Sequence, residues 1–428
     1  MLLNEHPSYG TTLVDLPSGG GLDCLADEWR GRDAGEYQVA FRNGIRHVRR
    51  LLPGVPGREA GPADAAAPVV TDTHTYLITG GLGGLGLTTA HHLVGLGARH
   101  IALVGRSATP PPDAAHLLES LRTKAEVTVH QGDISEPGDV RQIIAELTSA
   151  GPSRWAGSCT PLGALADMPV SELDWESLDA VFRAKVYGTW LLHEATAYLP
   201  ELRFFVGYSS AASVVGGATQ ANYAAANAFL DHLMVRRAAH GLPGLSINWG
   251  PWSEVGMSAR LGEPVLAAWQ SQGIKLFTPR RGMRALTTLL DGPAAQVVAG
   301  ECDWDRFTAA KPVANALYER LTGAGRPDTT AFDLDALLAQ APQERAAAVE
   351  EFVRTTVATV LHFESAESVE SDVPFPQLGL DSLVAMELKN ALERAFHLPL
   401  PASVAFDHPC AEQLAAHIDA QLTAGQPA

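Results

Sequence analysis

Three polar residues in the middle of the chain have the chemistry needed to protonate and hold a carbonyl oxygen. Tyr223 is a candidate proton donor, and Asn227 follows it by four residues, on the same face of a predicted helix. Ser210 lies thirteen residues before Tyr223, directly after a predicted strand at 204–208, so its hydroxyl could bind the same oxygen. Because a free phenol has a pKa of about 10, it needs a nearby ammonium to release its proton at neutral pH.

Reduction of a carbonyl group also needs a hydride. A glycine-rich segment far upstream could bind the nucleotide that supplies it. The run Tyr76-Leu-Ile-Thr-Gly-Gly-Leu-Gly-Gly-Leu-Gly86 places glycines between a predicted strand and a predicted helix over 87–96. Without side chains, this backbone can approach a pyrophosphate at the helix N-terminus. The strand–turn–helix context distinguishes this loop from a chance GxGxxG match. The predicted cofactor-binding loop comprises Thr79, Gly80, Gly81, Leu82, Gly83, Gly84, Leu85 and Gly86.

The end of the next predicted strand indicates which nucleotide is bound. An acidic residue there would bind the ribose hydroxyls of NAD. The chain instead has Gly105, Arg106 and Ser107, and a guanidinium suits the 2′-phosphate of NADPH. Asp133 closes the third strand, and with Ile134 it is expected to contact the adenine.

The pattern of short apolar runs divides the chain into four expected regions. Residues 1–70 are β-rich at first, with a hairpin turn at Asn43-Gly44, and continue into a Gly/Pro/Ala-rich linker from Gly54 to Pro68. Residues 71–310 alternate strands with helices, which predicts an α/β fold with a doubly wound parallel sheet. Residues 311–345 are expected to form a flexible linker, and 346–424 an all-α domain of four helices.

The all-α region carries a second motif with its own chemistry. Gly379-Leu-Asp-Ser-Leu383 precedes an amphipathic helix over 384–396, whose apolar stripe comprises Leu383, Met386, Leu388, Leu392 and Phe396. Asp381 could simply cap this helix. The complete motif in an acidic helical setting favours Ser382 as the attachment serine for 4′-phosphopantetheine.

The two motifs together resemble a fragment of a modular type I polyketide synthase, namely a ketoreductase domain of the short-chain dehydrogenase/reductase superfamily followed by an acyl carrier domain. Most short-chain reductases have lysine four residues after the tyrosine, whereas here Asn227 is in that place and Lys185 lies upstream. Asn248-Trp-Gly-Pro-Trp252 and Ala405-Phe-Asp-His-Pro409 also match. The resemblance implies that Lys185, Ser210, Tyr223 and Asn227 carry catalysis.

The resemblance also implies the substrate and the partners. The substrate would be a β-ketoacyl thioester on the arm of Ser382, reduced with NADPH during polyketide biosynthesis. Expected partners are upstream ketosynthase and acyltransferase domains and a phosphopantetheinyl transferase. Residues 1–70 resemble a shortened non-catalytic structural subdomain of the family.

One segment departs from the family pattern. Where relatives have a strand ending in His-Ala-Ala-Gly, the chain has Trp155-Ala-Gly-Ser-Cys-Thr-Pro-Leu-Gly163. The polar residues 158–160 and Pro161 are unfavourable in a central parallel strand. A pair of compensating frameshifts would explain the segment, since codons for these residues can encode Val-Val-His-Ala-Ala-Gly in another frame. The alternative function is therefore an inactive reductase that acts as a scaffold beside a working carrier domain.

Two positions bear on the stereochemistry expected from the resemblance. Relatives that form D-alcohols have Leu-Asp-Asp after the altered strand, and Leu165-Ala-Asp167 keeps the final Asp. Relatives that form L-alcohols tend to have Trp eight residues before the tyrosine, where this chain has Val215. No proline follows Tyr223 by two residues, as it does in epimerising relatives. The expected product is a D-hydroxyl without epimerisation, the B-type outcome.

Composition excludes several other classes of function. A net charge of −17 argues against nucleic acid or an anionic membrane as partner. The four cysteines are scattered singly without metal-ligand spacing, so no metal site is expected. No apolar run is long enough to span a membrane, and the N-terminus lacks a signal peptide, so a cytoplasmic location is expected. The acidity of the C-terminal region indicates either a solvated surface or a module that binds basic surfaces.

Overall fold

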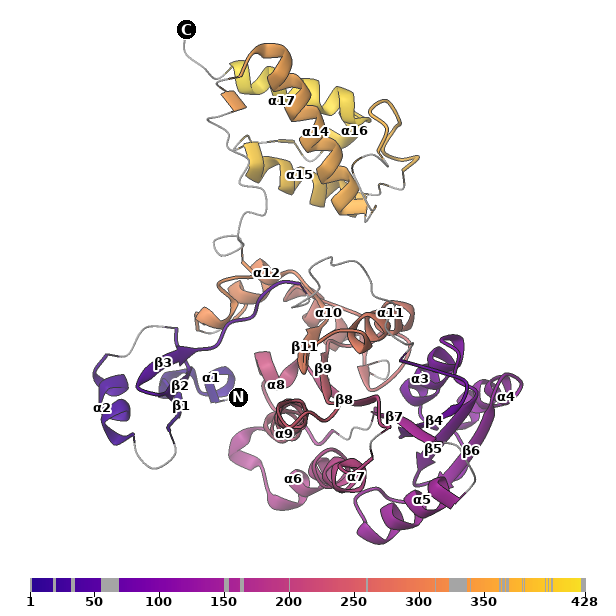
Figure 1. Ribbon diagram of the computed structural model, residues 1–428. Coiled ribbons are helices and arrows are strands. Elements are labelled where there is room, and N and C mark those ends of the chain that lie inside the picture. The colour runs from indigo at the N-terminus through magenta and orange to yellow at the C-terminus, as the bar shows by residue number, and fades with distance from the viewer. Residues whose placement is uncertain are drawn as a thin grey trace. The chain divides into compact units, whose positions relative to one another are not determined.

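A computed structural model describes most residues between 2 and 424. The chain divides into two compact units, residues 1–325 and 326–428, and each is described by itself (Figure 1). The predicted linker after Gly54 lies outside the described residues, as do Gly379 and Asp381. The segments left out are 18–20, 32–34, 55–68, 150–153, 162–164, 200, 259–260, 312, 323–336, 339, 362, 364–365, 367–368, 379, 381, 397, 399 and 402.

A seven-stranded parallel sheet forms the centre of the first unit, as the alternating pattern predicts. Its strand order is β11-β9-β8-β7-β4-β5-β6, and every neighbouring pair is parallel. The order reverses between β4 and β7, which makes the carboxyl ends of these strands the expected ligand site. The strands are β4 (His74–Thr79), β5 (His100–Gly105), β6 (Glu126–Gln131), β7 (Arg154–Thr160), β8 (Phe204–Ser210), β9 (Leu245–Trp249) and β11 (Gln296–Ala299).

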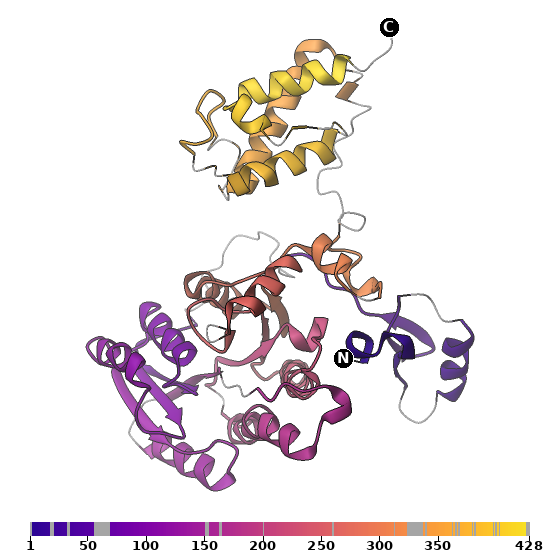
Figure 2. The same cartoon turned by 180° about the vertical axis from the view of Figure 1, so that it is seen from behind.

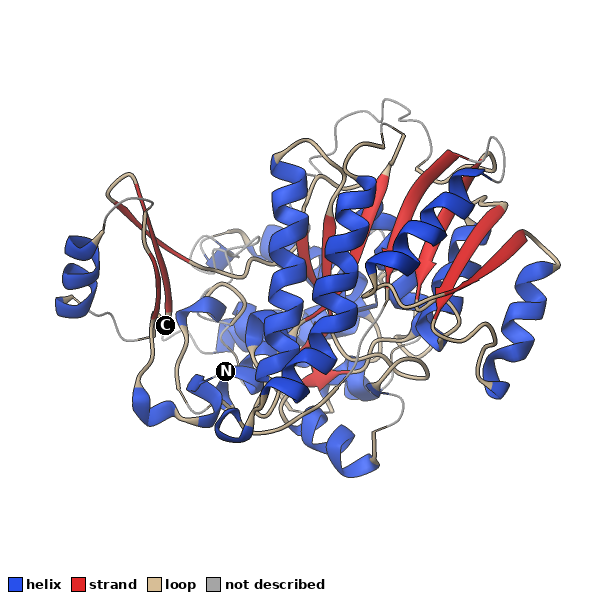
Figure 3. Ribbon diagram, turned by 90° about the horizontal axis from the view of Figure 1, so that it is seen from below, coloured by secondary structure: helices blue, strands red, loops and turns tan. Residues whose placement is uncertain are grey.

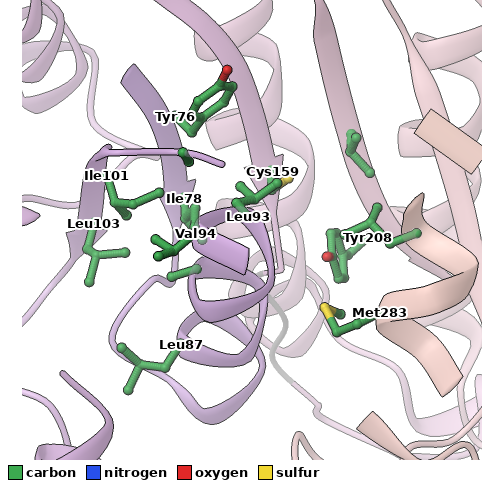
Figure 4. Packing of buried hydrophobic residues seen from close by; sticks show 14 of the residues in the cluster. Tyr76, Ile78, Leu87, Leu93, Val94, Ile101, Leu103, Cys159, Tyr208 and Met283 are labelled. Carbon is green, nitrogen blue, oxygen red and sulfur yellow. The ribbon is translucent and has the colours of Figure 1, made fainter. Parts of the chain in front are cut away.

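Helices cover both faces of this sheet, and alternate strand residues supply a core to each face (Figure 3). On one face Tyr76, Ile78 and Leu103 pack against Leu87 and Leu93, as Figure 4 shows. On the other face the intervening residues pack against helices α5, α7 and α9. The helices are α3 (Gly84–Gly95), α4 (Ala115–Arg122), α5 (Pro137–Ser149), α6 (Trp175–Phe182), α7 (Gly188–Thr196), α8 (Ala212–Val215), α9 (Ala221–Ala239), α10 (Glu263–Ser271), α11 (Pro279–Leu290) and α12 (Trp304–Ala309).

The altered segment forms the central strand β7, although its polar residues and Pro161 are unfavourable in such a strand. Residues 157–160 pair with β8, and 154–159 pair with β4 through a register shift next to Trp155. Two local features explain why the strand is tolerated. The Thr160 hydroxyl donates to the Val206 carbonyl at 3.2 Å, and Pro161 follows the last strand residue, where no ladder amide is needed. The Ser158 hydroxyl has no partner among the described residues, which costs about 1–3 kcal/mol.

The N-terminal segment forms a small three-stranded sheet of its own. Strand β2 (Gln38–Arg42) pairs antiparallel with β3 (Ile45–Val48), and the turn residues Asn43 and Gly44 have φ values of 52° and 75°. Two positive φ values are the signature of a type I′ turn, so the predicted hairpin is present. Strand β1 (Leu13–Asp15) adds parallel to β2. The segment also contains helices α1 (Leu2–Glu5) and α2 (Leu22–Arg30).

Part of the predicted linker at 311–345 is packed rather than free. Residues 316–318 form a 3₁₀ helix, and Leu317 and Tyr318 are buried against Val214 and Phe307. Leu337 belongs to the core of the second unit. Apolar side chains within an Ala-rich stretch therefore find partners that composition did not reveal. The remaining strands of the first unit are the antiparallel pair β10 (Ile274–Lys275) and β12 (Glu301–Cys302).

The second unit is all-α in its described residues, with four helices as expected. They are α14 (Pro342–Leu361), α15 (Ser382–Phe396), α16 (Val404–Asp407) and α17 (Ala411–Ala424). The predicted stripe residues Leu388, Leu392 and Phe396 are buried among Val353 and Leu414. The side chains of Leu383 and Met386 lie outside the described residues. In the described part of the whole chain, no helix has both the length and the apolarity to cross a membrane.

Candidate active site

The predicted nucleotide loop connects β4 to α3 at the switch point of the sheet. Gly80 has a φ of 64°, and Gly83 precedes the first residue of α3. A Cβ on Gly86 would lie 2.4 Å from the Gly80 carbonyl oxygen, and one on Gly81 would lie 2.7 Å from the Ile78 carbonyl oxygen. Only glycine fits at both positions, because helix and strand approach so closely there.

The loop has the features that a bound pyrophosphate requires. The N-terminus of twelve-residue α3 supplies unpaired backbone donors, which favour an anion. The buried Thr79 hydroxyl has no hydrogen-bond partner among the described residues. The side chain of Leu82 is buried in the core on one face of the sheet, and that of Leu85 is partly buried against the same core. The residues present therefore fit a nicotinamide dinucleotide.

The predicted specificity residues follow β5 and β6. Gly105 ends β5, and Arg106 and Ser107 after it are exposed. Asp133 accepts hydrogen bonds from the Ser135 amide at 2.9 Å and hydroxyl at 2.7 Å. Burial alone would raise the pKa of Asp133, but these bonds and the charges of Arg183 and Arg106 lower it overall. Ile134 is buried in the core on the second face of the sheet.

The predicted catalytic residues Ser210, Tyr223 and Asn227 come together at the ends of β8 and α9. Tyr223 is only 8% exposed, and burial raises the pKa of its phenol above the ordinary value of 10.0. Hydrogen bonding with the side chains of Ser210 and Asn227 acts in the opposite direction. The phenol is therefore protonated at neutral pH and can act as a donor. The side-chain amide nitrogen of Asn227 donates to the Tyr223 carbonyl at 2.8 Å. The side-chain oxygen of Asn227 has no partner among the described residues.

Lys185 lies beside these residues in a π-helical turn, Arg183–Tyr187, between α6 and α7. Its ammonium donates to the Tyr208 carbonyl at 2.8 Å and lies 5.7 Å from the centre of the Tyr223 ring. Burial lowers the pKa of Lys185 to about 7, and the charge of Asp231 opposes this. Such π turns are frequent at functional sites because they re-aim one side chain of a helix. The tertiary structure thus places the ammonium that the tyrosine requires.

Asp231 is a residue of this site that was not predicted from the sequence. It lies on α9 at the third position of the series Tyr223, Asn227, Asp231, each four residues apart. Its carboxylate accepts from the Ser246 hydroxyl at 2.5 Å, the Ser213 hydroxyl at 2.6 Å and the Asn248 amide at 2.8 Å. The Ser213 oxygen also lies 2.9 Å from the Ser210 carbonyl oxygen, so Ser213 connects Asp231 to the strand end that carries Ser210. The four-residue spacing is the sequence signal that would have found it.

The two predicted stereocontrol residues lie near the entrance to α9. Asp167 is exposed and accepts from the Gln220 amide at 3.0 Å. Val215 is the last residue of α8, and its carbonyl accepts from the Tyr318 hydroxyl at 3.3 Å. In the second unit, Ser382 is the first residue of α15, at the helix N-terminus expected for an attachment serine.

Comparison with known proteins identifies both units. The KR domain family matches residues 74–254, and the phosphopantetheine attachment site family matches 351–418. The solved ketoreductase from the first module of phoslactomycin biosynthesis in Streptomyces sp. HK803 is 30% identical, with a TM-score of 0.63. The match covers 73% of this chain and 71% of that one. The chain belongs to the modular polyketide synthases.

Other members of the family show the same relationship. The first ketoreductase of the tylosin polyketide synthase is 34% identical, with a TM-score of 0.63, over 74% of this chain and 66% of that one. A phenolphthiocerol/phthiocerol polyketide synthase protein of Mycobacterium tuberculosis is 34% identical over 100% of this chain and 23% of its own length. Erythronolide synthase EryA3 of Saccharopolyspora erythraea is 34% identical over 99% of this chain. The match covers only 13% of that synthase.

This polyketide synthase chain therefore spans a quarter or less of the length of these two curated relatives. It combines a ketoreductase domain, whose family uses NADPH, with a carrier domain whose family carries 4′-phosphopantetheine. These findings agree with the fold class and with both cofactors predicted from the sequence.

Proposed function

We propose that the chain reduces a β-ketoacyl thioester, carried on the phosphopantetheine arm of Ser382, to a β-hydroxyacyl thioester during polyketide biosynthesis. The observation that carries the proposal is the meeting of Tyr223, Ser210 and Lys185 beside the carboxyl ends of the strands where the glycine loop lies. The intermediate would reach the chain from ketosynthase and acyltransferase domains, and a phosphopantetheinyl transferase would load Ser382. The proposed domains are a structural segment at 1–70, a reductase at 71–310, a carrier at 346–424 and a linker at 311–345, of which residues 316–318 pack on the first unit.

The protein's own residues account for the proton transfer. The Ser210 hydroxyl donates a hydrogen bond to the ketone oxygen and orients it toward the phenol of Tyr223. Because burial keeps Tyr223 protonated, the phenol gives its proton to the oxygen as negative charge develops there. The Lys185 ammonium stabilises the phenolate that is left, and Asn227 offers its amide oxygen, which no described residue contacts by a hydrogen bond. When bound, NADPH supplies the hydride to the β-carbon.

Replacing Tyr223 with phenylalanine tests this function directly. Tyr223→Phe should lower ketone reduction by about 10²–10⁴-fold, because only the transferable proton is lost. Reduction of a diffusible β-ketoacyl thioester is followed by the loss of NADPH absorbance, and NADPH binding by fluorescence titration. Tyr198→Phe changes a tyrosine that is 91% exposed and serves as the matched control. Retention of more than a tenth of the activity by Tyr223→Phe would exclude this tyrosine as the donor.

The altered strand supports a second candidate, an inactive reductase that acts as a scaffold beside a working carrier. The strand β7 borders the switch point, and its Ser158–Thr160 stretch replaces the His-Ala-Ala-Gly strand end of the resemblance. The NADPH titration separates the two functions. Failure of the unsubstituted chain to bind NADPH would favour the scaffold, and sequencing of the coding DNA would test the compensating frameshifts.

For the active enzyme we further propose the B-type outcome, a D-configured alcohol without α-epimerisation. Asp167 and Val215 support it, since they occupy the positions of the two stereochemical signatures. Solved relatives include A-type ketoreductases, so family membership alone does not decide between the two outcomes. Chiral chromatography of the product gives the answer, and a predominance of the L-alcohol would refute the assignment.

A further inference from the structure

Two loops form one edge of the candidate site, and hydrogen bonds join them to each other. The first runs from Leu165 to Leu173 and carries Asp167, and the second runs from Gly216 to Gln220 and leads into α9. The Met168 backbone amide donates to the Thr219 carbonyl at 2.8 Å, and the Gln220 side-chain amide donates to the Asp167 carboxylate at 3.0 Å. Tyr223 follows Gln220 by three residues, so the position of these loops determines that of the first turn of α9.

A carboxylate from the other end of the sequence binds both loops at once. Glu5, the last residue of α1, accepts from the Val170 amide at 2.8 Å and from the Thr219 amide at 2.9 Å. Each oxygen atom takes one backbone donor, and each donor belongs to a different loop. Hydrogen bonds to a charged acceptor are about twice as strong as neutral ones. Figures 1 and 2 show α1 beside the Rossmann-like body, next to α8 and α9.

The second loop contains a strained backbone conformation at Thr219. Thr219 has a φ of 63°, in the left-handed region that a β-branched residue rarely adopts. Such a conformation costs about 1–3 kcal/mol and persists only where the surroundings enforce it. Two hydrogen bonds hold this residue in place. The Thr219 amide donates to the Glu5 carboxylate, and the Thr219 carbonyl accepts from the Met168 amide.

The segment that carries Glu5 is itself attached to the body of the first unit. Arg50 forms ion pairs with Glu36 in the N-terminal segment and, at 2.7 Å, with Glu319 beyond the catalytic domain. The Leu51 amide donates to the Leu317 carbonyl at 2.9 Å. The Leu13 amide donates to the Tyr37 carbonyl at 2.9 Å, which joins β1, the strand that follows α1, to this attached segment.

We propose that Glu5 is a positioning residue for ketone reduction, a clamp that sets the loop bearing Asp167 against the loop that leads to Tyr223. This assigns the short N-terminal segment a role at the site, although it supplies no group that touches the reacting atoms. The effect on catalysis rests on the proposed reductase function, but the clamp itself can be measured without turnover.

Hydrogen–deuterium exchange of the full chain measures the clamp. Glu5→Gln should speed exchange about tenfold or more in peptides covering 166–173 and 216–221, because the Gln side chain has only one oxygen for two amide donors. Glu5→Ala, which leaves no acceptor, should speed it further. Asp23→Asn removes the same charge from the exposed face of α2 and should change neither peptide. Unchanged exchange in both loops of Glu5→Gln would overturn the proposal, whether or not the chain reduces ketones.

Steady-state kinetics then separate positioning from general loss of structure. Glu5→Gln should lower kcat/KM for a diffusible β-ketoacyl thioester about tenfold, and it should lower the stereochemical purity of the alcohol. The dissociation constant of NADPH and the thermal midpoint should stay those of the unsubstituted chain. Parallel losses in NADPH affinity, thermal midpoint and kcat/KM would assign Glu5 a structural role only and overturn its role as a positioning residue. Unchanged kcat/KM and product configuration would overturn it equally.

Discussion

The burial of Lys185 predicts a measurable effect on stability, because an ammonium that is removed from water destabilises the folded chain. Its ordinary pKa is 10.5, and burial lowers this value to about 7. The unfolded chain therefore binds a proton on Lys185 more tightly than the folded chain does. By linkage, this difference in pKa lowers the free energy of unfolding by roughly 5 kcal/mol at pH values below 7. This loss of stability becomes smaller as the pH rises from 7 toward 10.5.

Lys185→Met should accordingly stabilise the first unit while abolishing turnover. The substitution removes the desolvated charge but also the hydrogen bond to the Tyr208 carbonyl, whose loss costs about 1–3 kcal/mol. The net gain at pH 6 should be about 2–4 kcal/mol. Because the penalty in the unsubstituted chain falls by about 1.4 kcal/mol per pH unit above pH 7, the gain should be about 2.7 kcal/mol smaller at pH 9.

Urea denaturation followed by tryptophan fluorescence measures this difference in the full chain without NADPH. All eight tryptophans lie within residues 1–325, so the signal reports on the first unit alone. Lys124→Met replaces an exposed lysine and should not alter the pH dependence of stability. A stability difference between Lys185→Met and the unsubstituted chain that is equal at pH 6 and pH 9 would refute the buried, weakly basic ammonium.

Two further predictions concern the cofactors. Arg106→Ala should weaken NADPH more than NADH, since a charge-assisted contact to the 2′-phosphate is worth about 1.5–3 kcal/mol; Arg141→Ala on α5 is the control. Equal losses for both dinucleotides in a fluorescence titration would contradict this role of Arg106. Ser382→Ala should block the mass gain on incubation with coenzyme A and a phosphopantetheinyl transferase, whereas Ser403→Ala should not. Modification of Ser382→Ala at another serine would disprove the attachment site, and a diffusible thioester should still be reduced by this variant.

Local patterns explain why so much of the fold could be predicted. The glycine loop depends on residues adjacent in the sequence, and a Cβ on Gly86 meets an atom only six residues away, in Gly80. The Asn43-Gly44 turn and the apolar stripe of α15 are equally local. In contrast, the composition of 155–161 could not predict that a central strand forms there, because strand formation depends on β4 and β8 on either side. Two well-formed neighbours can hold a strand of small polar residues in place.

The sequence by itself determined the chemistry available to this protein: a nucleotide loop, a tyrosine four residues from an asparagine, and a serine at the start of a carrier helix. Each depends on the spacing of near neighbours along one element. The packing of the folded chain brings distant groups to that chemistry. Lys185 comes from a π turn 38 residues before Tyr223, and Glu5 reaches two loops that are 165 and 214 residues away. Contacts across such distances depend on how the elements pack, because the chain between them sets no fixed separation.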